Sequence, residues 1–372
     1  MKKILFLIET VRPTSGWGRV ASELGIRLRK YDIEPFFLTE DDSGDLGKER
    51  PLKNSLASLK STLLNVWKVR KYVKQCDLIH SLDVYPYGLI AALANVGINK
   101  PFVTTAIATY SIMPLENKKL RTFVMWTYHK VDRIFPITNY LMGEIGKRVK
   151  KLPPMERVLL GVDANKFSVK EKTNIFDIKH PYLLTVGALK VRRGHHFVLP
   201  ALVKVKKKYP NIKYIIAGDC SNTGYVNFLK KTIKELDLED NVEICGMVSE
   251  NEMLQLYQNC LAFVLISENS PTYFASFHLV QLEAYGFSKP VISAEGYGAD
   301  EVVIEGKTGY LVDPNDSGVI AERIIGLLDD TELTKKLGEQ ANEFARELSW
   351  DKMAEGYVKG YEKVFEEKSK KN

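Results

Sequence analysis

Short apolar segments alternate with amphipathic stretches along the first half of the chain. The apolar segments have the length of β-strands, and the stretches between them place apolar residues at helical spacing. Predicted strands are Ile4–Ile8, Pro35–Leu38, Leu78–His80, Phe102–Thr105, Arg133–Ile137 and Arg157–Leu160, and predicted helices are Val20–Lys30, Leu56–Lys74 and Tyr140–Val149. Because strand–helix alternation builds a parallel sheet covered by helices on both faces, this half is predicted to be a doubly wound α/β domain.

The same alternation restarts after a polar, charged stretch at 168–180. Its strands are predicted at Tyr182–Val186, Tyr214–Ala217, Val242–Ile244, Leu261–Ile266, Val291–Ser293 and Tyr310–Val312, and its helices at His196–Lys208, Val226–Leu236, Glu250–Gln258, Ser317–Leu328 and Thr331–Leu348. A chain of 372 residues exceeds what one hydrophobic core usually organises. We therefore expect two Rossmann-like domains at 1–170 and 171–348, followed by an amphipathic helix at 349–372.

Composition and charge narrow the class of protein. Hydrophobic residues make up 45% and charged residues 27%, which is typical of a soluble globular protein. Residues 1–167 carry 27 basic and 16 acidic residues (+11), and the remainder carries 26 and 30 (−4). A basic half can bind nucleic acid or an anionic membrane, or only aid solubility. Nucleic acid is disfavoured, because the basic runs are not interleaved with aromatic residues in a binding motif.

Targeting segments and metal sites are not evident. The apolar run in MKKILFLIET is too short for a signal peptide and is read as a first buried strand. No stretch reaches the roughly 18 apolar residues of a membrane span. Four cysteines, Cys76, Cys220, Cys245 and Cys260, lack ligand spacing and are read as buried free thiols in a reducing cytoplasm. The histidines do not pair with carboxylates at the spacing of metal ligands, and the sequence contains no Asp-x-Asp pattern.

Residues 260–312 form the stretch with the clearest chemical signal. An apolar strand (Cys260–Ile266) leads through a polar loop into a helix that carries one acid, Glu283, among apolar residues, and a second strand follows at Val291–Ala294. A loop that opens onto a helix N-terminus favours anions such as phosphate. A carboxylate beside a core is costly unless it accepts hydrogen bonds, although an acid on a partly exposed helix would equally explain Glu283.

Glycine-bearing turns occur at the carboxyl ends of other predicted strands. Gly16 and Gly18 follow the first strand, where backbone can approach a ligand closely, although an ordinary turn has the same composition. The segment from Gly187 to Gly194 adds Lys190, Arg192 and Arg193 and would suit a diphosphate, unless it is only a solvated basic turn. Two further strand ends lead into Gly218-Asp219 and Gly246-Met247-Val248.

The combined motifs resemble those of retaining, nucleotide-sugar-dependent glycosyltransferases of the two-Rossmann GT-B type, family 4. The motifs are Leu282-Glu283-Ala284, Gly286, Lys289-Pro290-Val291-Ile292, Gly309-Tyr310-Leu311-Val312 with Pro314, and the linker sequence Gly161-Val162-Asp163. Each is weak alone, and together they are specific and span nearly the whole chain. The resemblance implies a GT-B fold whose domains face a cleft that receives the sugar, and whose last helix crosses back to pack on the N-terminal domain.

The resemblance also implies the ligands and their residues. The donor is a nucleotide-diphosphate sugar in the C-terminal domain, with UDP favoured over GDP although the base stays open, and no cofactor or metal is implied. Arg193 stands for a family lysine, and Lys190 would supply the second charge on the diphosphate. Backbone at Met247 and Val248 would hold the base, and Glu283 would bind the ribose. The implied catalytic residues are Lys190, Arg193 and Glu283, and the implied binding residues are Gly16, Gly18, Gly187, Asp219, Met247, Val248, Phe277, His278, Leu279, Val280 and Glu283.

The expected activity is transfer of the sugar, with retention, to a glycan or lipid-linked acceptor in cell-envelope polysaccharide or glycolipid synthesis. Three polar family positions are apolar here, Ile107, Ala188 and Ala275, and Glu268 could substitute for the acid missing at Ala275. They motivate a second hypothesis, a catalytically impaired GT-B subunit that binds or regulates a partner transferase. A sugar-nucleotide epimerase fits less well, because that class lacks the Leu-Glu-Ala helix followed by Pro-Val-Ile.

Two basic amphipathic stretches bear on where the protein acts. Lys53–Lys74 and Lys118–Arg133 contain Trp67, Phe123 and Trp126 among lysines and arginines. Such stretches can rest on an anionic leaflet, so a cytoplasmic protein at the inner face of the membrane is one expectation. Helices packed on the sheet with a solvated basic face are the alternative.

Overall fold

The protein is described by a computed structural model, which covers residues 1–13, 15–41, 52, 59–163, 178–270, 273–274, 276 and 278–370. The chain divides into two compact units. Unit 1 comprises Met1–Gly161 together with Trp350–Asn372, and unit 2 comprises Val162–Ser349.

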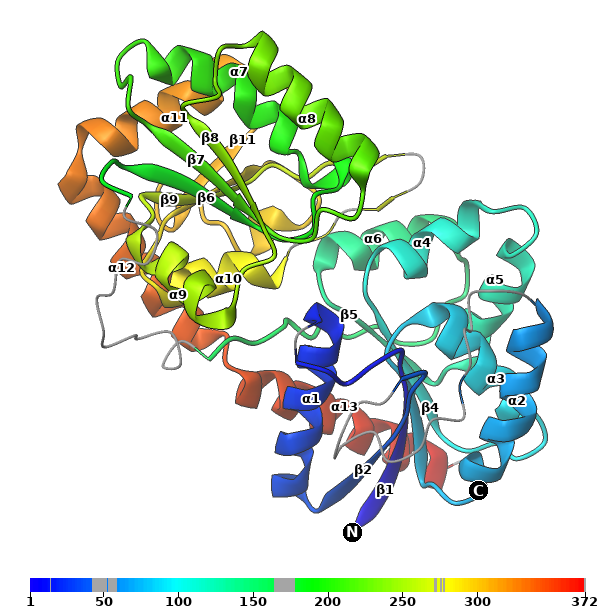
Figure 1. Ribbon diagram of the computed structural model, residues 1–372. Coiled ribbons are helices and arrows are strands. Elements are labelled where there is room, and N and C mark those ends of the chain that lie inside the picture. Colours follow the sequence, from blue (N-terminus) through cyan, green and yellow to red (C-terminus); the bar gives the residue numbers. More distant parts are fainter. Residues whose placement is uncertain are drawn as a thin grey trace. The chain divides into compact units, whose positions relative to one another are not determined.

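Unit 1 is built on a five-stranded parallel sheet with the strand order β2-β1-β3-β4-β5. Its strands are β1 (Lys2–Leu7), β2 (Ile33–Leu38), β3 (Leu78–Ser81), β4 (Phe102–Ala106) and β5 (Arg133–Pro136). Its helices are α1 (Gly16–Leu28), α2 (Leu59–Val73), α3 (Leu89–Asn95), α4 (Thr109–Glu116), α5 (Arg121–Lys130), α6 (Asn139–Arg148) and α13 (Trp350–Ser369). In Figure 1, α1 and α13 lie on one side of the sheet and α2, α3 and α5 on the other. Central strands are therefore covered on both faces, which explains the continuous apolar run at Ile4–Leu7.

A buried polar network fixes α13 to the sheet of unit 1. His80 on β3 lies 2.7 Å through Nδ1 from the Tyr361 hydroxyl and 2.8 Å through Nε2 from Thr105 Oγ1. Thr105 on β4 in turn donates to the Tyr357 hydroxyl at 3.0 Å. Burial lowers the pKa of His80 to about 3, so the ring is neutral and can both donate and accept. Because every member has a partner, the network specifies one position for the helix, and the predicted return of the last helix to the N-terminal domain is confirmed.

Unit 2 contains a six-stranded parallel sheet with the order β11-β10-β9-β6-β7-β8. Its strands are β6 (Tyr182–Val186), β7 (Lys213–Ala217), β8 (Val242–Gly246), β9 (Ala262–Leu265), β10 (Val291–Ala294) and β11 (Gly309–Val312). Its helices are α7 (His195–Lys206), α8 (Thr223–Glu235), α9 (Glu250–Asn259), α10 (Leu279–Gly286), α11 (Ser317–Asp329) and α12 (Thr331–Glu347).

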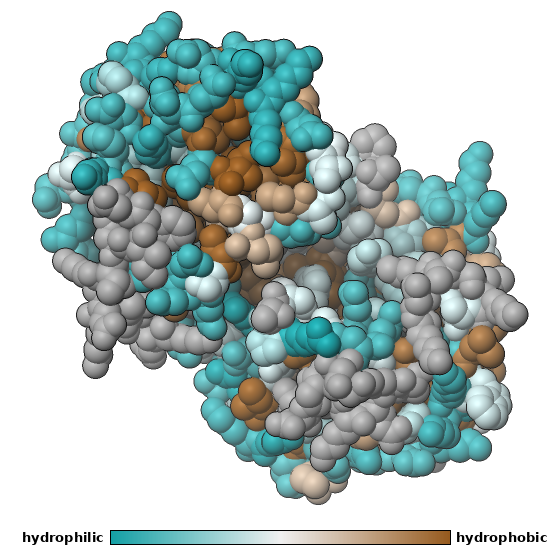
Figure 2. All heavy atoms as spheres, viewed as in Figure 1, coloured by the Kyte–Doolittle hydropathy of each residue, from teal (hydrophilic) through white to brown (hydrophobic). Residues whose placement is uncertain are grey.

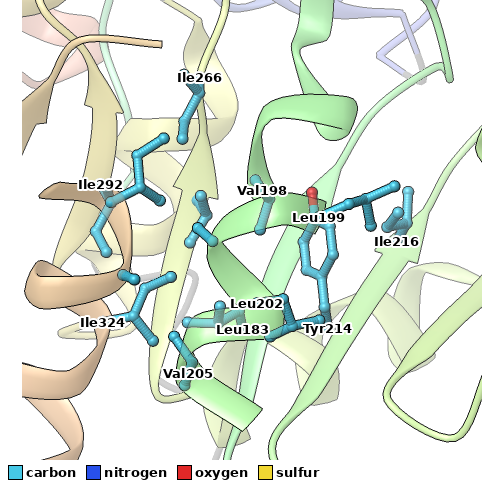
Figure 3. Packing of buried hydrophobic residues seen from close by; sticks show 14 of the residues in the cluster. Leu183, Val198, Leu199, Leu202, Val205, Tyr214, Ile216, Ile266, Ile292 and Ile324 are labelled. Carbon is cyan, nitrogen blue, oxygen red and sulfur yellow. The ribbon is translucent and has the colours of Figure 1, made fainter. Parts of the chain in front are cut away.

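The core of unit 2 lies between its sheet and the helices α7, α8 and α11. Val198, Leu202 and Val205 recur at helical spacing on α7 and are at most 1% exposed. They meet strand residues such as Leu183 and Ile292, which are fully buried (Figure 3). This packing positions the carboxyl ends of the strands and the loops that leave them.

The structure confirms the predicted fold class, two doubly wound parallel α/β domains, and corrects two details. The predicted strand Arg157–Leu160 is not a strand. The segment forms one isolated bridge with β5, between Ile134 and Met155. The Val158 N–H still donates to the Pro136 carbonyl at 3.0 Å, but Pro136 has no N–H to return a hydrogen bond, so the pairing stops there. The four cysteines are free, but only Cys76 and Cys260 are buried, whereas Cys220 and Cys245 are partly exposed.

Candidate functional site

The loops at the carboxyl edge of the unit 2 sheet are joined by backbone hydrogen bonds. The Gly187 N–H donates to the Ala217 carbonyl at 2.8 Å, and the Gly218 N–H donates to the Gly246 carbonyl at 2.8 Å. The Leu189 N–H donates to the Asp219 carbonyl at 2.9 Å. The loops after β6, β7 and β8 therefore form one connected backbone layer, at the edge where open α/β sheets bind ligands.

A short turn before α7 determines where the cations of this edge lie. Val191–Arg193 form one 3₁₀ turn, and Gly194 follows with a φ of 68°. A Cβ at Gly194 would lie 1.7 Å from the Ile266 carbonyl oxygen, so the turn presses directly on the end of β9. Only glycine combines this close approach with a left-handed conformation. The result is that the Arg193 guanidinium lies against Gly187, whose built Cβ would be 3.0 Å from Arg193 Cζ.

Arg193 presents buried donors that no described residue satisfies. Its Nε and Nη1 are buried and have no hydrogen-bond partner among the described residues. Burial lowers the pKa of Arg193, and the positive charge of Arg192 lowers it further, while the charge of Glu283 has the opposite effect. Buried donors normally have partners, and a charged group without them is costly. The geometry is therefore that of a cation ready to bind an anion.

Glu283 is buried on α10 and hydrogen-bonded. It is 8% exposed, and its Oε2 accepts a hydrogen bond of 3.1 Å from the Tyr257 hydroxyl on α9. The Tyr257 ring is itself stacked with the rings of Phe263 and Phe287. The alternative that Glu283 is a partly exposed surface acid is therefore wrong. A carboxylate held in this position can accept hydrogen bonds from the hydroxyl groups of a ligand.

His278 lies immediately before α10 and is neutral. Its Nε2 is 3.1 Å from Ser267 Oγ, and its backbone N–H donates to Gln281 Oε1 at 3.2 Å. Burial, followed by the charges of Arg193 and Arg192, lowers the pKa of His278 well below its ordinary value. Ser276 Oγ is also buried and has no partner among the described residues. Neutral donors near a helix N-terminus add to the anion-binding character of this edge.

Lys190 and Arg193, the two cations that the resemblance assigns to the diphosphate, differ in their exposure to solvent. Lys190 is exposed, and its charge acts on Asp219, whose pKa is lowered mainly by hydrogen bonds from Ser221. Arg192 is the cation adjacent to Arg193, and its guanidinium carbon lies 3.9 Å from the centre of the Tyr273 ring. Sequence reasoning had noted Arg192 as one of three cations and gave it no role.

The remaining predicted residues lie on the loops and helix starts of the same edge. Met247 is 77% exposed and Val248 partly exposed after β8, and Leu279 and Val280 are partly exposed in the first turn of α10. Phe277 and Ala275 lie outside the described residues. Tyr257 was missed by sequence reasoning, since nothing in its surroundings on α9 signals that it meets Glu283.

In unit 1, the glycine-bearing turn after β1 starts α1. Ser15 caps the helix, because its Oγ accepts a hydrogen bond of 2.9 Å from the Gly18 N–H. A Cβ at Gly18 would lie 2.1 Å from the Arg12 carbonyl oxygen, whereas one at Gly16 would meet nothing within 4 Å. Gly18 is therefore required by packing, and Gly16 leaves open space at the helix start.

A buried acid lies next to Ile107 at the carboxyl edge of unit 1. Asp83, 5% exposed, accepts hydrogen bonds at Oδ1 from the Val84 N–H (2.7 Å) and from Ser111 Oγ (2.9 Å). The Ile107 N–H donates to the same Ser111 Oγ at 2.9 Å. Burial raises the pKa of Asp83 to about 8, so the group is mostly protonated at neutral pH. Sequence reasoning missed Asp83, although an acid directly after a strand is a usable signal.

Further acids occur at the ends of β1 and β2. Glu40 accepts a hydrogen bond of 2.9 Å from the Tyr87 hydroxyl, and Asp41 pairs with Arg12 at 3.0 Å. Burial and the charges of Glu40 and Asp41 raise the pKa of Glu9. The carboxyl groups described at this edge therefore include Glu9, Glu40, Asp41 and Asp83.

The described residues form neither a metal-binding cluster nor a membrane-spanning helix. Among the described residues, no group of three or more His, Cys, Asp or Glu side chains is placed to hold a metal ion. Within the same part of the chain, no helix has the length and apolar character needed to cross a membrane.

Two protein-family models match consecutive parts of the chain. The model Glycosyltransferase Family 4 matches residues 14–166, and the model Glycosyl transferases group 1 matches residues 167–344. Together with the fold, these matches show that the chain belongs to the GT-B glycosyltransferases of the family 4 type.

Curated relatives and solved structures agree with this assignment. An uncharacterised glycosyltransferase of Methanocaldococcus jannaschii is 26% identical over 90% of this chain and 92% of its own length. The capsular polysaccharide biosynthesis glycosyltransferase CapM of Staphylococcus aureus is 26% identical over 94% and 92%. Solved structures with the same fold include a glycosyltransferase from Rickettsia africae (TM-score 0.78, 19% identity, 98% of both chains). Another is Anabaena HepE in complex with UDP-glucose (TM-score 0.78, 19% identity, 98% of this chain and 100% of that one).

Proposed function

We propose that this protein is a retaining, metal-independent hexosyltransferase. It transfers a sugar from a nucleotide-diphosphate sugar, UDP-linked rather than GDP-linked, to a glycan or lipid-linked acceptor. Its product belongs to cell-envelope polysaccharide or glycolipid synthesis. The S. aureus relative supports the polysaccharide assignment, because it is named for capsular polysaccharide biosynthesis. A relative of Bacillus anthracis, 24% identical over 94% of this chain, is named an N-acetyl-α-D-glucosaminyl L-malate synthase and supports hexosyl transfer only.

One observation carries the proposal, the arrangement around Arg193. Two buried donor nitrogens of Arg193, which no described residue satisfies, lie beside Gly187, and a buried carboxylate, Glu283, is close enough to act on the arginine's pKa. A nucleotide-diphosphate sugar carries both matching groups, an anionic diphosphate and a ribose diol. The proposed roles are Arg193, with Arg192 and Lys190, for the diphosphate, Glu283 for the ribose, and backbone at Met247–Val248 for the base.

The proposed chemistry needs no protein base. The bond between the anomeric carbon and the phosphate oxygen breaks, and its electron pair stays on the diphosphate, where the positive charge of Arg193 stabilises it. The acceptor hydroxyl attacks the same face of the sugar, and its proton passes to the departing phosphate oxygen. Configuration at the anomeric carbon is thereby retained.

Unit 1 is proposed to hold the acceptor. Gly16 leaves open space at the start of α1, and Asp83 offers a carboxyl group beside Ile107. Hydroxyl groups of a sugar can both donate to and accept from such an edge. A lipid-linked acceptor would bring the protein to the inner face of the membrane as a peripheral protein.

The test is a transfer assay with one donor at a time, UDP-glucose, UDP-N-acetylglucosamine or GDP-mannose, against glycan and lipid-extract acceptors. Release of the nucleoside diphosphate is measured with and without EDTA, and the anomeric configuration of the product is read by proton NMR. We expect one UDP-sugar to be used, at the same rate in EDTA, with the donor's configuration kept. An inverted product, or activity lost in EDTA, would contradict the proposal.

A second candidate is an impaired subunit that binds or regulates a partner transferase. It is favoured by Ile107 and Ala188, which place apolar side chains where the family is polar. Under this candidate the assay gives no turnover with any donor, while Ala275→Glu or Ala188→Arg raises it strongly. If neither variant is faster than the wild type, the apolar residues at positions 188 and 275 do not limit turnover, which would contradict this candidate.

A further inference from the structure

One face of α2 exposes large apolar side chains to solvent. Leu63 is 56% exposed, Leu64 57% and Trp67 80%, whereas Thr62, Asn65 and Val69 on the opposite face are at most 2% exposed. The exposed positions recur at three- and four-residue spacing and continue with Lys71 and Lys74, so they share one side of the helix. We define the α2 face as Leu63, Leu64, Trp67, Lys71 and Lys74.

The charge of this helix has one sign. Residues 59–76 contain five basic residues and no acid; the basic residues are Lys60, Lys68, Arg70, Lys71 and Lys74. Arg70 has a structural role, because its Nη1 donates to the carbonyls of Ala94 at 2.9 Å and Val96 at 2.7 Å. Those bonds hold the basic end of α2 against the end of α3.

A basic pocket borders the same end of α3. It has a volume of about 300 Å³, and Val96, Lys100, Trp126 and Lys130 are among its lining residues. Its one lining acid, Asp132, is paired with Lys368 at 2.8 Å. Val96 is 53% exposed, and Phe123 on α5 is 45% exposed. Figure 2 shows apolar atoms open at the surface on the side of unit 1 that carries α2 and α5. The α2 face is thus the apolar part of a wider basic surface.

The combination indicates which kind of partner fits. Exposed apolar residues grouped on one helix face mark an interaction site. A second copy of the chain is a poor fit, since a two-fold contact would place two surfaces of the same positive charge against each other. Tryptophan and leucine beside lysine are the residues that bind the boundary between headgroups and acyl chains of an anionic membrane.

We propose that the α2 face docks on an anionic lipid bilayer. Leu63, Leu64 and Trp67 enter the headgroup region, and Lys71 and Lys74 contact the anionic headgroups. The inference rests on the proposed function only for its purpose, which is to bring the protein to a lipid-linked acceptor. Docking on plain vesicles needs neither donor nor acceptor, so the two can fail separately.

The test is co-sedimentation of the full-length protein with vesicles of phosphatidylcholine, alone or mixed with phosphatidylglycerol. We expect binding to the mixed vesicles only, and at least a tenfold loss of affinity in both Leu63→Ser/Trp67→Ser and Lys71→Glu/Lys74→Glu. Phe228→Ser and Lys231→Glu on α8 of unit 2 are matched controls, since Phe228 is 49% and the Lys231 side chain 76% exposed. Both controls should bind like the wild type.

Tryptophan emission gives a second readout. Mixed vesicles should shift the emission to shorter wavelength, and Trp67→Phe should abolish the shift. Failure of the wild type to bind mixed vesicles overturns the proposal, as does unchanged binding in either double variant. Equal thermal midpoints exclude misfolding, and unchanged stabilisation by a nucleotide sugar in the docking variants separates this result from the proposed function.

Discussion

The carboxyl edges of the two sheets share an architecture and differ in chemistry. In unit 2, Arg192 and Arg193 lie at the edge with buried nitrogens that have no described partner, and a single buried acid, Glu283, accompanies them. In unit 1, the edge carries the acids Glu9, Glu40, Asp41 and Asp83, and Asp41 pairs with Arg12.

The comparison shows what the fold provides and what it leaves to side chains. Parallel α/β topology puts loop backbone and helix starts at one edge in both units. The side chains at that edge then favour a ligand: in unit 2, cations with buried nitrogens that no described residue satisfies suit a diphosphate, and in unit 1, carboxyl groups suit hydroxyl groups. Four predictions test this contrast.

The largest effect is expected from Arg193→Met. Removing a cation that faces the charge developing on the leaving diphosphate should lower turnover by about 10²–10³-fold. Initial rates of nucleoside diphosphate release measure it. Arg323→Met on α11, where the arginine pairs with Glu305 at 2.8 Å, is the control and should keep the wild-type rate. Equal rates in both variants would mean that Arg193 does not stabilise the leaving diphosphate.

A smaller effect should follow from Glu283→Gln. A hydrogen bond to a charged group contributes about 1.5–3 kcal/mol, so loss of the carboxylate should weaken nucleotide-sugar binding by roughly 10- to 100-fold. Titration calorimetry gives the dissociation constants. The exposed Glu235→Gln on α8 should bind like the wild type. If Glu283→Gln also binds normally, the carboxylate does not contact the donor.

The acid of unit 1 predicts a pH dependence of stability. The pKa of Asp83 is about 8 in the folded protein, above the unfolded value of about 3.9, so between these values the folded state holds a proton that the unfolded state has released. The contribution of Asp83 to stability should therefore fall as pH rises, by about 1.4 kcal/mol per pH unit between pH 5 and 7. Buried neutral histidines such as His80 act in the opposite direction below about pH 6.5, so the quantity to measure is the difference in the free energy of unfolding between wild type and Asp83→Asn. Denaturant unfolding should show that this difference changes with pH by the stated slope. A difference that does not change with pH would mean that Asp83 is already ionised in the folded protein.

The smallest effect is expected from Lys190→Ala. Because Lys190 is exposed and acts on Asp219, its contribution to donor binding is screened by water, and only a few-fold rise in the dissociation constant is expected. The same titrations at low and high salt test it. A loss as large as that of Arg193→Met would mean that Lys190 is as important a partner of the diphosphate as Arg193.

The sequence was sufficient for the fold because its signals are local. Apolar runs, helical spacing and glycine turns predicted two doubly wound domains, and most strand positions were close to those observed. The predicted strand at Arg157–Leu160 was wrong, because Pro136 at the end of β5 has no N–H with which to extend the pairing.

The site was only partly predictable because its contacts are long-range. Glu283 could be singled out as an acid among apolar residues, but its partner Tyr257 lies on another helix. Whether Lys190 or Arg192 accompanies Arg193 depends on the direction of a turn set by Gly194 against β9, which spacing alone does not encode. The Asp83–Ser111–Ile107 hydrogen bonds join two loops in the same way.

The central claim is that the edge of unit 2 binds a nucleotide-diphosphate sugar through Arg193 and Glu283. Thermal unfolding with UDP- and GDP-sugars, for the wild type, Arg193→Met and Glu283→Ala, tests it most directly. A ligand at a hundred times its dissociation constant adds about 2.7 kcal/mol to the free energy of unfolding. The account predicts stabilisation of the wild type by one nucleotide sugar and its loss in both variants. No stabilisation by any of them, or equal stabilisation of all three proteins, would contradict it.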